Sequence, residues 1–345
     1  MLIFTLVFIL LLFLPIKFSK GIPFESLSLE CSSIIRGICC FLIILHHLAQ
    51  SSTKHDFLTP YFTNWVGFLS VSCFFFFSGY GLMKSFLRKP EYAKTFLTRR
   101  ILPIGVAYTA FLLAYWVGGV VTNAGYTAMD LLTSFFTTYP VFTNAWYVAV
   151  SLLFYLAFFL MMCLLKDKSK WFLPASLSWC IVWSVVCGTM GWSNFWCKTC
   201  FCIPLGIGVA LYESSIVAAA KKHYWWFVAS ATSIFACSVY FAQFSTGTFL
   251  ERQIYSIVQS TSFVAEVLLI SMWVQARNRL WSFLATISLE VYLTHPLFMK
   301  LLRSGIVFIS NDIIWGILVI ILTIPTAFVA HFVLTKVSGL LQGHK

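Results

Sequence analysis

Long apolar stretches recur from one end of the chain to the other, and they leave little room for anything except a membrane protein. Of the 345 residues, 60% are hydrophobic and only 10% are charged. A soluble globule of this length has too little polar surface to cover such a composition. The sequence therefore predicts an all-α fold, a polytopic bundle of transmembrane helices.

Eleven apolar segments are candidate transmembrane helices. They cover approximately residues 2–16, 34–49, 65–83, 101–121, 145–165, 171–190, 197–212, 224–244, 256–275, 282–302 and 313–337. The first segment lacks the basic start and the small-residue cleavage site of a secretory signal, so we interpret it as a span or signal anchor. We expect three parts: an extra N-terminal span and linker (1–30), one membrane domain (31–337) and a short cytoplasmic tail (338–345).

Strict alternation of these spans sorts the basic residues between the two sides of the membrane. It assigns 18 of the 23 to the same side as residues 84–100. The other five are Lys54, Lys198, Arg252, Lys300 and Arg303. Because basic residues concentrate in cytoplasmic loops, residues 84–100 should be cytoplasmic and residues 122–144 external. The N-terminus is then outside and the C-terminus inside, in the cytoplasmic (inner) cell membrane. The net charge of +12 reflects this topology, and no nucleic-acid partner is expected.

The segment "RGICCFLIILHH" places a cation and two histidines at opposite ends of an apolar run. In an α-helix Arg36 and His47 lie about 16 Å apart, and their eleven-residue offset is close to three whole turns. The two residues therefore share a face, whereas His46 points about 80° away. A histidine inside a membrane can simply bond between helices, but the matching position of Arg36 favours a functional role for His47.

Other polar residues also occur within or beside predicted spans. The segment "ISLEVYLTHPLF" contains Glu290, Tyr292 and His295, and Pro296 should kink that helix. In "FFFFSGYGLMKSF" the small residues indicate close helix packing. The adjacent guanidinium groups of Arg99 and Arg100 suit a phosphate ligand.

The cysteines carry no clear metal or disulfide pattern. The segment "WCKTCFC", with Cys197, Cys200 and Cys202, resembles half of a zinc site, but no second Cys/His pair lies nearby in the sequence. We interpret these cysteines as small apolar residues at a helix end and expect no metal.

Five segments run in order from about residue 31 to residue 302: "SIIRGICCFLIILHH", "FFFFSGYGL", "FLTRRILPI", "NAWYVAVSLLFYL" and "ISLEVYLTHPLF". In these motifs the chain resembles acyltransferase family 3, whose members acylate cell-surface glycans and related acceptors. The family has about ten spans and uses cytoplasmic acyl-CoA, usually acetyl-CoA. The resemblance thus implies a ten-helix core plus one extra N-terminal span, with Arg36 and His47 essential and with Arg99 and Arg100 in the donor region.

One family feature is missing here. Many members have a Trp followed five or six residues later by a Glu before "FY", but after Trp146 this chain has Ser151 and Leu152 ahead of Phe154 and Tyr155. A carboxylate therefore has no role at that place, and the acceptor subclass is left open.

These observations define candidate residues of three kinds. The catalytic candidates are His47, Arg36, His295 and Glu290. The candidates for binding the acyl-CoA donor are Arg99, Arg100, Ser78 and Lys84. The candidates for binding the acceptor are Trp146, Tyr292 and Asn144.

The function expected is O-acyl transfer, in particular acetyl transfer, from acyl-CoA to a hydroxyl of an extracytoplasmic glycan or glycolipid. His47 would act as a general base or as a carrier of the acyl group; we favour the base, because an acyl-imidazole must be shielded from water. The alternative is a secondary transporter or polysaccharide exporter with a His/Glu proton relay, against which no inverted repeat of spans is seen. The lipid bilayer is the other partner, and association into a homo-oligomer is left open.

Overall fold

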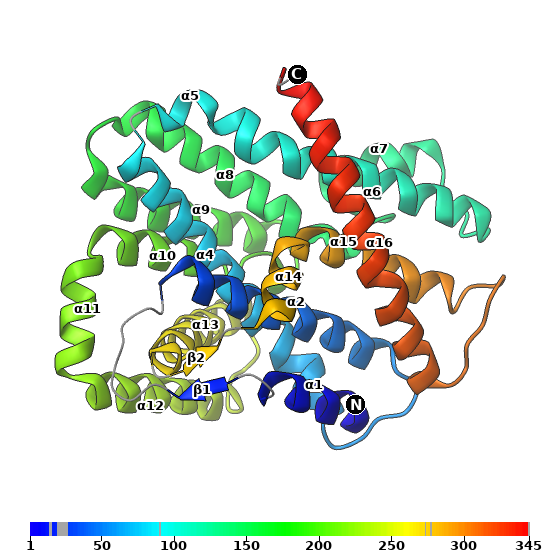
Figure 1. Ribbon diagram of the computed structural model, residues 1–345, viewed down its shortest axis with the longest axis horizontal. Helices are drawn as coiled ribbons and strands as arrows, with labels where there is room; N and C mark the ends of the chain where they lie inside the picture. Colours follow the sequence, from blue (N-terminus) through cyan, green and yellow to red (C-terminus); the bar gives the residue numbers. More distant parts are fainter. Residues whose placement is uncertain (14–15, 19–26, 90, 273, 277, 344–345) are drawn as a thin grey trace.

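The computed structural model describes the chain except residues 14–15, 19–26, 90, 273, 277 and 344–345 (Figure 1). Most of the described residues are helical, 82% in all. Two three-residue strands, β1 (Ile16–Phe18) and β2 (Val274–Ala276), form one antiparallel pair. The predicted linker around residues 19–26, with Lys20, and the basic residues Arg277 and Lys345 lie outside the described residues.

Within the described residues, eight helices are long and apolar enough to cross a membrane. Two of them are compound: α3 (Thr59–Tyr61) continues through a π-helical turn (Phe62–Val66) into α4 (Gly67–Arg88), and α5 (Tyr92–Phe96) continues through Leu97–Ile101 into α6 (Leu102–Val121). The other six are α2 (Leu29–Ser51), α8 (Trp146–Leu165), α9 (Phe172–Thr189), α12 (Tyr224–Ala242), α13 (Phe249–Ser271) and α16 (Asp312–Leu341). They correspond to eight of the eleven predicted segments, which confirms an all-helical, multi-pass membrane fold.

The first predicted span differs from the structure. Helix α1 (Leu2–Phe13) has twelve residues, which is about 18 Å of helix against about 30 Å of hydrocarbon. Residue 16, the predicted end of that span, lies in β1. Helix α1 packs on the bundle through Phe8, whose ring centre is 6.0 Å from those of Phe41 and Trp281.

Two further predicted spans are broken in the structure. Within 197–212 only α10 (Cys202–Leu211) is helical beyond a turn, and α11 (Glu213–Lys222) leaves it at 91°. The segment 282–302 is divided between α14 (Arg279–Thr286) and α15 (Ser288–Leu301). Breaks of this kind leave the apolar composition unchanged, so hydropathy does not detect them. The count of about eleven spans remains a prediction.

The predicted loops are more helical than expected. Helix α4 extends to Arg88 and α5 begins at Tyr92, so residues 84–100 are not an open loop. Residues 122–144 contain the amphipathic helix α7 (Ala128–Thr137), whose Thr127 and Asp130 side chains form a capping box. The amide and hydroxyl of Thr127 donate to the Asp130 carboxylate and hold its pKa below the usual range. Single 3₁₀ turns (Thr143–Ala145, Ser169–Trp171 and Asn194–Trp196) precede α8, α9 and α10.

Helix α4 lies at the centre of the bundle, packed against α2, α10 and α13 (Figure 1). Two glycines bring α4 and α10 into backbone contact. A Cβ at Gly79 would lie 2.1 Å from the carbonyl oxygen of Ile203, and one at Gly206 would lie 2.2 Å from that of Phe76. Such small residues let helix backbones approach closely where lipid provides little hydrophobic driving force for association. The prediction of close packing around "SGYG" is correct for Gly79.

We therefore expect Gly79→Ala to destabilise the protein, whereas Gly81→Ala should not. A Cβ at Gly81 meets no atom within 4 Å, so this substitution keeps only the favourable helix propensity of alanine. At Gly79 the clash with a backbone carbonyl should cost about 1–3 kcal/mol. Thermal unfolding of the two variants in the same detergent measures the difference, and equal melting temperatures would contradict the proposed contact.

Candidate functional site

One face of α2 connects the two ends of the bundle. The Ser28 side chain caps the helix by accepting from the Cys31 amide at 3.1 Å, and the helix then runs unbroken to Ser51 because its interior contains no proline. Arg36 therefore lies three turns below His47 on the same side of the helix. We call the two ends of the bundle the Arg36 end and the His47 end.

A cavity of about 860 Å³ opens along the Arg36 end of this face. Arg36, Cys40 and Ile43 of α2 line it, at the helical spacing that leads on to His47. In the part of the chain that the structure describes, five cationic side chains and one carboxylate surround the cavity. They are Arg36, Lys84, Arg88, Lys89 and Arg100, with Glu213. A volume within the range of about 300–1,000 Å³ and a net positive wall suit an anionic small molecule.

Within the described residues, the guanidinium of Arg36 bonds only to groups of its own helix. Its Nε donates to the Ser32 carbonyl at 3.2 Å, and a terminal nitrogen donates to the Ser33 hydroxyl at 3.3 Å. Among the residues that the structure describes, no carboxylate lies within 4.0 Å of it. The remaining donors of this half-buried cation are therefore available to a ligand in the cavity.

The predicted donor-binding residues divide into two groups. Ser78, Lys84 and Arg100 line the cavity, but Arg99 is exposed and does not. Arg100 donates to the Tyr92 hydroxyl at 3.1 Å, and Ser78 accepts from the Tyr155 hydroxyl at 3.3 Å. The structure therefore does not bring Arg99 into the same cavity as its neighbour, because successive residues of a helical turn point in different directions.

Glu213 was missed by the sequence analysis. It begins α11, immediately after the bend from α10, and its carboxylate accepts from Lys84 at 2.6 Å and from the Tyr80 hydroxyl at 2.9 Å. The ion pair holds the Lys84 ammonium at the cavity wall. No local sequence pattern indicates this pairing, since it depends on the 91° bend.

A layer of tyrosines lines the cavity on the side of the histidines, since the Tyr292 ring centre lies 6.1 Å from that of His295. Tyr292 lines the cavity, and its hydroxyl donates to the carbonyl of Asn144. The Tyr147 ring packs edge-on at 5.3 Å from the Tyr292 ring. Trp146 points elsewhere, toward Phe195 at 5.5 Å, and does not line the cavity. The segment after Trp146, which lacks the glutamate noted above, also lies at the cavity, because Ser151 and Tyr155 form part of its wall.

Beyond the tyrosines three imidazoles lie in a row. The His47 ring centre is 5.1 Å from that of His295 and 4.8 Å from that of His46. The Nδ1 atoms of His46 and His295 bond to the carbonyls of Phe62 at 2.7 Å and Val291 at 2.9 Å.

The Gln50 side chain is the hydrogen-bond partner of His47. Its oxygen faces Nδ1 of the ring at 3.0 Å. In this orientation of the amide the oxygen accepts, so Nδ1 carries the hydrogen and Nε2 keeps a lone pair. The same argument gives His295 a free Nε2, which is buried and has no partner among the described residues. The pair of rings can accept a proton without first giving one up.

The Glu290 side chain is separated from His295, although both were candidate catalytic residues of one segment. Its carboxylate bonds to Nδ1 of His331 on α16 at 2.9 Å, and it lines neither this cavity nor the one described next. A five-residue offset turns a helix by about 140°, so the two side chains point to different sides of α15. His331 was missed; a single histidine in the apolar segment "AFVAHFVL" was the available signal.

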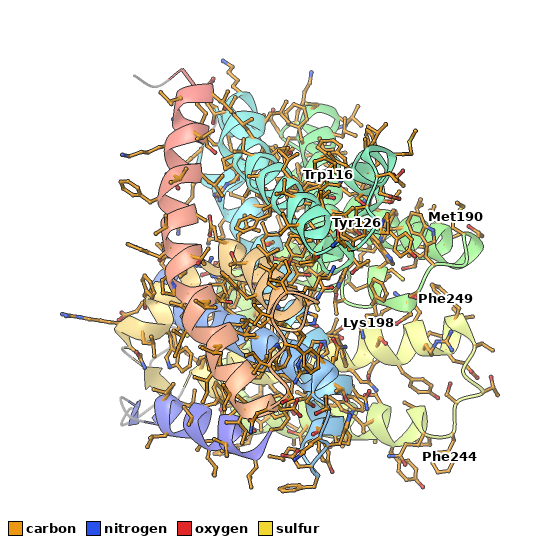
Figure 2. All side chains as sticks on the ribbon, turned by 90° about the vertical axis from the view of Figure 1, so that its right-hand side faces the viewer. Trp116, Tyr126, Met190, Lys198, Phe244 and Phe249 are labelled. Atoms are coloured by element: carbon orange, nitrogen blue, oxygen red, sulfur yellow. The ribbon has the colours of Figure 1, made fainter. Side chains whose placement is uncertain are left out.

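A second, smaller cavity of about 280 Å³ lies at the His47 end. It is lined by Ser51, Asn144, Pro296, Met299, Lys300, Arg303 and Trp315. Figure 2 shows this end of the bundle, where Met190, Phe244 and Phe249 mark the ends of α9, α12 and α13. The Tyr292 hydroxyl and Asn144 carbonyl thus stand between the two cavities.

The cysteine cluster contains no metal-binding arrangement among the described residues. Cys197 bonds to the Gln253 side chain at 3.3 Å, and Cys200 and Cys202 are buried in the core.

The fold and the cavities define an integral membrane protein of many helices with an internal cationic binding site. The acyltransferase-domain family model of acyltransferase family 3 matches residues 29–332, most of the chain. The chain therefore belongs to this family and is a membrane acyltransferase. No curated protein and no solved structure matches it.

Proposed function

We propose that the protein transfers an acyl group, specifically acetyl, from cytoplasmic acyl-CoA to a hydroxyl of an extracytoplasmic glycan or glycolipid. The observation that carries the proposal is the continuous α2 face. It joins a cavity with five cations at one end to a pair of adjacent imidazoles at the other. A transferase that takes a phosphorylated donor from one side and a hydroxyl from the other needs both.

The large cavity suits CoA in charge and in size. Arginine and lysine side chains bind phosphate through charge-assisted hydrogen bonds, and Arg36 has donors to spare for this. Arg100 stands at the exposed rim, where the nucleotide end of a donor would lie. The tyrosine layer supports a small acyl group, because the Tyr147 and Tyr292 rings pack closely where the thioester must pass.

The chemistry then takes place at His47. Its Nε2 accepts the proton of the acceptor hydroxyl as the oxygen attacks the thioester carbonyl. The new C–O bond forms, the C–S bond breaks, and the CoA thiolate leaves and is protonated. His295, with its ring 5.1 Å away, positions the base and shares the proton. Orientation follows the basic residues: the Arg36 end is cytoplasmic and the His47 end is external, in the inner cell membrane.

Purified protein in lipid vesicles tests the proposal directly. Acetyl-CoA is supplied on the side of the Arg36 end, and release of free CoA thiol is recorded with and without a cell-surface glycan fraction. An acyltransferase of this kind should consume the thioester and label the glycan. Intact thioester under all conditions would instead favour the rival function, a transporter whose His and Glu side chains relay protons.

The two adjacent arginines provide a matched pair for the donor site. We expect Arg100→Ala to raise KM for acetyl-CoA about tenfold, since losing one exposed charge-assisted contact to phosphate costs about 1.4 kcal/mol. Arg99→Ala should leave KM unchanged, because its side chain lies outside the cavity. Equal KM values for the two variants would remove Arg100 from the donor site.

A further inference from the structure

The smaller cavity adjoins the imidazole pair. Ser51 in its wall is four residues after His47 on α2, and Met299 is four residues after His295 on α15. Four residues correspond to about 6 Å of helix, so both imidazole-bearing helices continue directly into the cavity wall. Neither ring lines the cavity itself, but Pro296 follows His295 directly and Ser51 is about one turn from His47, so a molecule bound here would lie within about one helical turn of the imidazole pair.

Topology does not account for the charge of this cavity. Among the described residues, its lining contains Lys300 and Arg303 and no carboxylate. The alternation of spans assigns only five of the 23 basic residues to this end, and two of those five line this one cavity. The distribution of basic residues across membranes disfavours cations on the outer side, so a reason other than orientation must retain them.

The guanidinium of Arg303 is occupied by hydrogen bonds and ring stacking within the protein. It donates to the Asp312 carboxylate and to the carbonyls of Ser51 and Ile309. Its guanidinium also stacks 3.9 Å from the ring centre of Trp315. These contacts neutralise the charge of Arg303 and make it part of the cavity wall.

Lys300, by contrast, contacts only neutral groups. Its Nζ lies 3.5 Å from the Val141 carbonyl and 5.4 Å from the ring centre of Tyr115. No carboxylate of the described chain lies within 4.0 Å of it. The Lys300 ammonium therefore offers an uncompensated positive charge at the exposed edge of the cavity, on a side of α15 about 140° from that of His295.

Building on the proposed function, we propose that the acceptor is an anionic glycan. A carboxylate or phosphate group on the sugar binds Lys300, and a hydroxyl of the same or the adjoining sugar then reaches Nε2 of His47. The volume of about 280 Å³ is just below the usual range of about 300–1,000 Å³ for ligand sites, which fits a single sugar unit of a longer chain. Charge at Lys300 thus selects the acceptor, while the imidazole pair performs the reaction.

Surface glycans of cells that express the protein test this assignment. We expect the acylated sugar, or the sugar joined to it, to carry a carboxylate or a phosphate, and mass analysis tells the two apart. Lys300→Ala should lower acylation at least tenfold at matched expression, and Lys300→Arg should retain most of it. Lys54→Ala is the control, because Lys54 is exposed at the same end but lines neither cavity.

With the isolated glycan and purified protein, Lys300→Ala should raise KM for the glycan far more than it changes kcat. An acylated sugar without any nearby anionic group would overturn the inference, and so would normal acylation by Lys300→Ala. If acyl transfer itself were wrong, the result would differ from both of these outcomes: the wild-type protein would neither release CoA thiol nor acylate any glycan.

Discussion

Replacing His47 with alanine should lower the rate of acyl transfer by about a hundredfold to ten-thousandfold, the usual effect of removing a general base. His47 lies on the α2 face that the large cavity follows, and its Nε2 keeps a lone pair because Nδ1 donates to Gln50. The His295 ring adjoins it but is held by a backbone carbonyl. Turnover of acetyl-CoA with a glycan acceptor measures the loss at matched expression.

His46→Ala is the matched control and should retain most of the activity. The His46 ring turns toward α4, where it bonds to the Phe62 carbonyl at 2.7 Å and packs against Gly67. Its removal costs stability rather than chemistry, so the variant should unfold at a lower temperature. An inactive His46→Ala protein beside an active His47→Ala protein would show that the assignment of the base is wrong.

Arg36→Ala should reduce kcat/KM for acetyl-CoA at least a hundredfold. A hydrogen bond to a charged group contributes about 1.5–3 kcal/mol, and the fork of a guanidinium can make two of them to one phosphate. Arg36 has the free donors for this, because its own contacts are one carbonyl and one hydroxyl. Steady-state kinetics with varied acetyl-CoA measures the change.

One further variant separates geometry from charge at Arg36, and a second variant at the surface serves as its control. Arg36→Lys keeps the positive charge but loses the fork, so it should recover only part of the activity. Lys94→Ala removes a cation that pairs with Glu91 on the surface and does not line the cavity, so its kinetics should match the wild type. Full activity in Arg36→Ala would exclude this residue from donor binding.

Much of the helical architecture was predictable because hydropathy and length alone define an uninterrupted span. Helix α2 contains no proline and only one glycine, so the shared face of Arg36 and His47 followed from helix geometry. Breaks such as that between α14 and α15 were not predictable. The backbone of Trp281 on α14 packs directly against Gly37 of α2. A Cβ at Gly37 would lie 1.9 Å from the Trp281 carbonyl oxygen, and this contact joins helices that are far apart in sequence.

The candidate site was predictable only where its residues share one helix. Lys84 was identified from the basic segment, but its partner Glu213 depends on how α10 bends into α11. The pairing of Glu290 with His331 likewise depends on the rotation of α15 against α16. Such pairings arise from tertiary packing, which neither local composition nor spacing encodes.

The tyrosine layer also has an electrical consequence under the proposed function. Tyr292, bonded to the Asn144 carbonyl, separates the cavity that would release the CoA thiolate from the imidazoles that would take the hydroxyl proton. If the imidazolium returns its proton across the layer to the thiolate, turnover moves no net charge. If it releases the proton on the His47 side, each turnover displaces one elementary charge, worth about 2.3 kcal/mol per 100 mV of membrane potential. In that second case the thiolate takes its proton from the cytoplasmic side, so positive charge moves outward and an interior-negative potential opposes the reaction. The barrier between the cavities therefore decides whether surface acylation is independent of the membrane voltage or works against it.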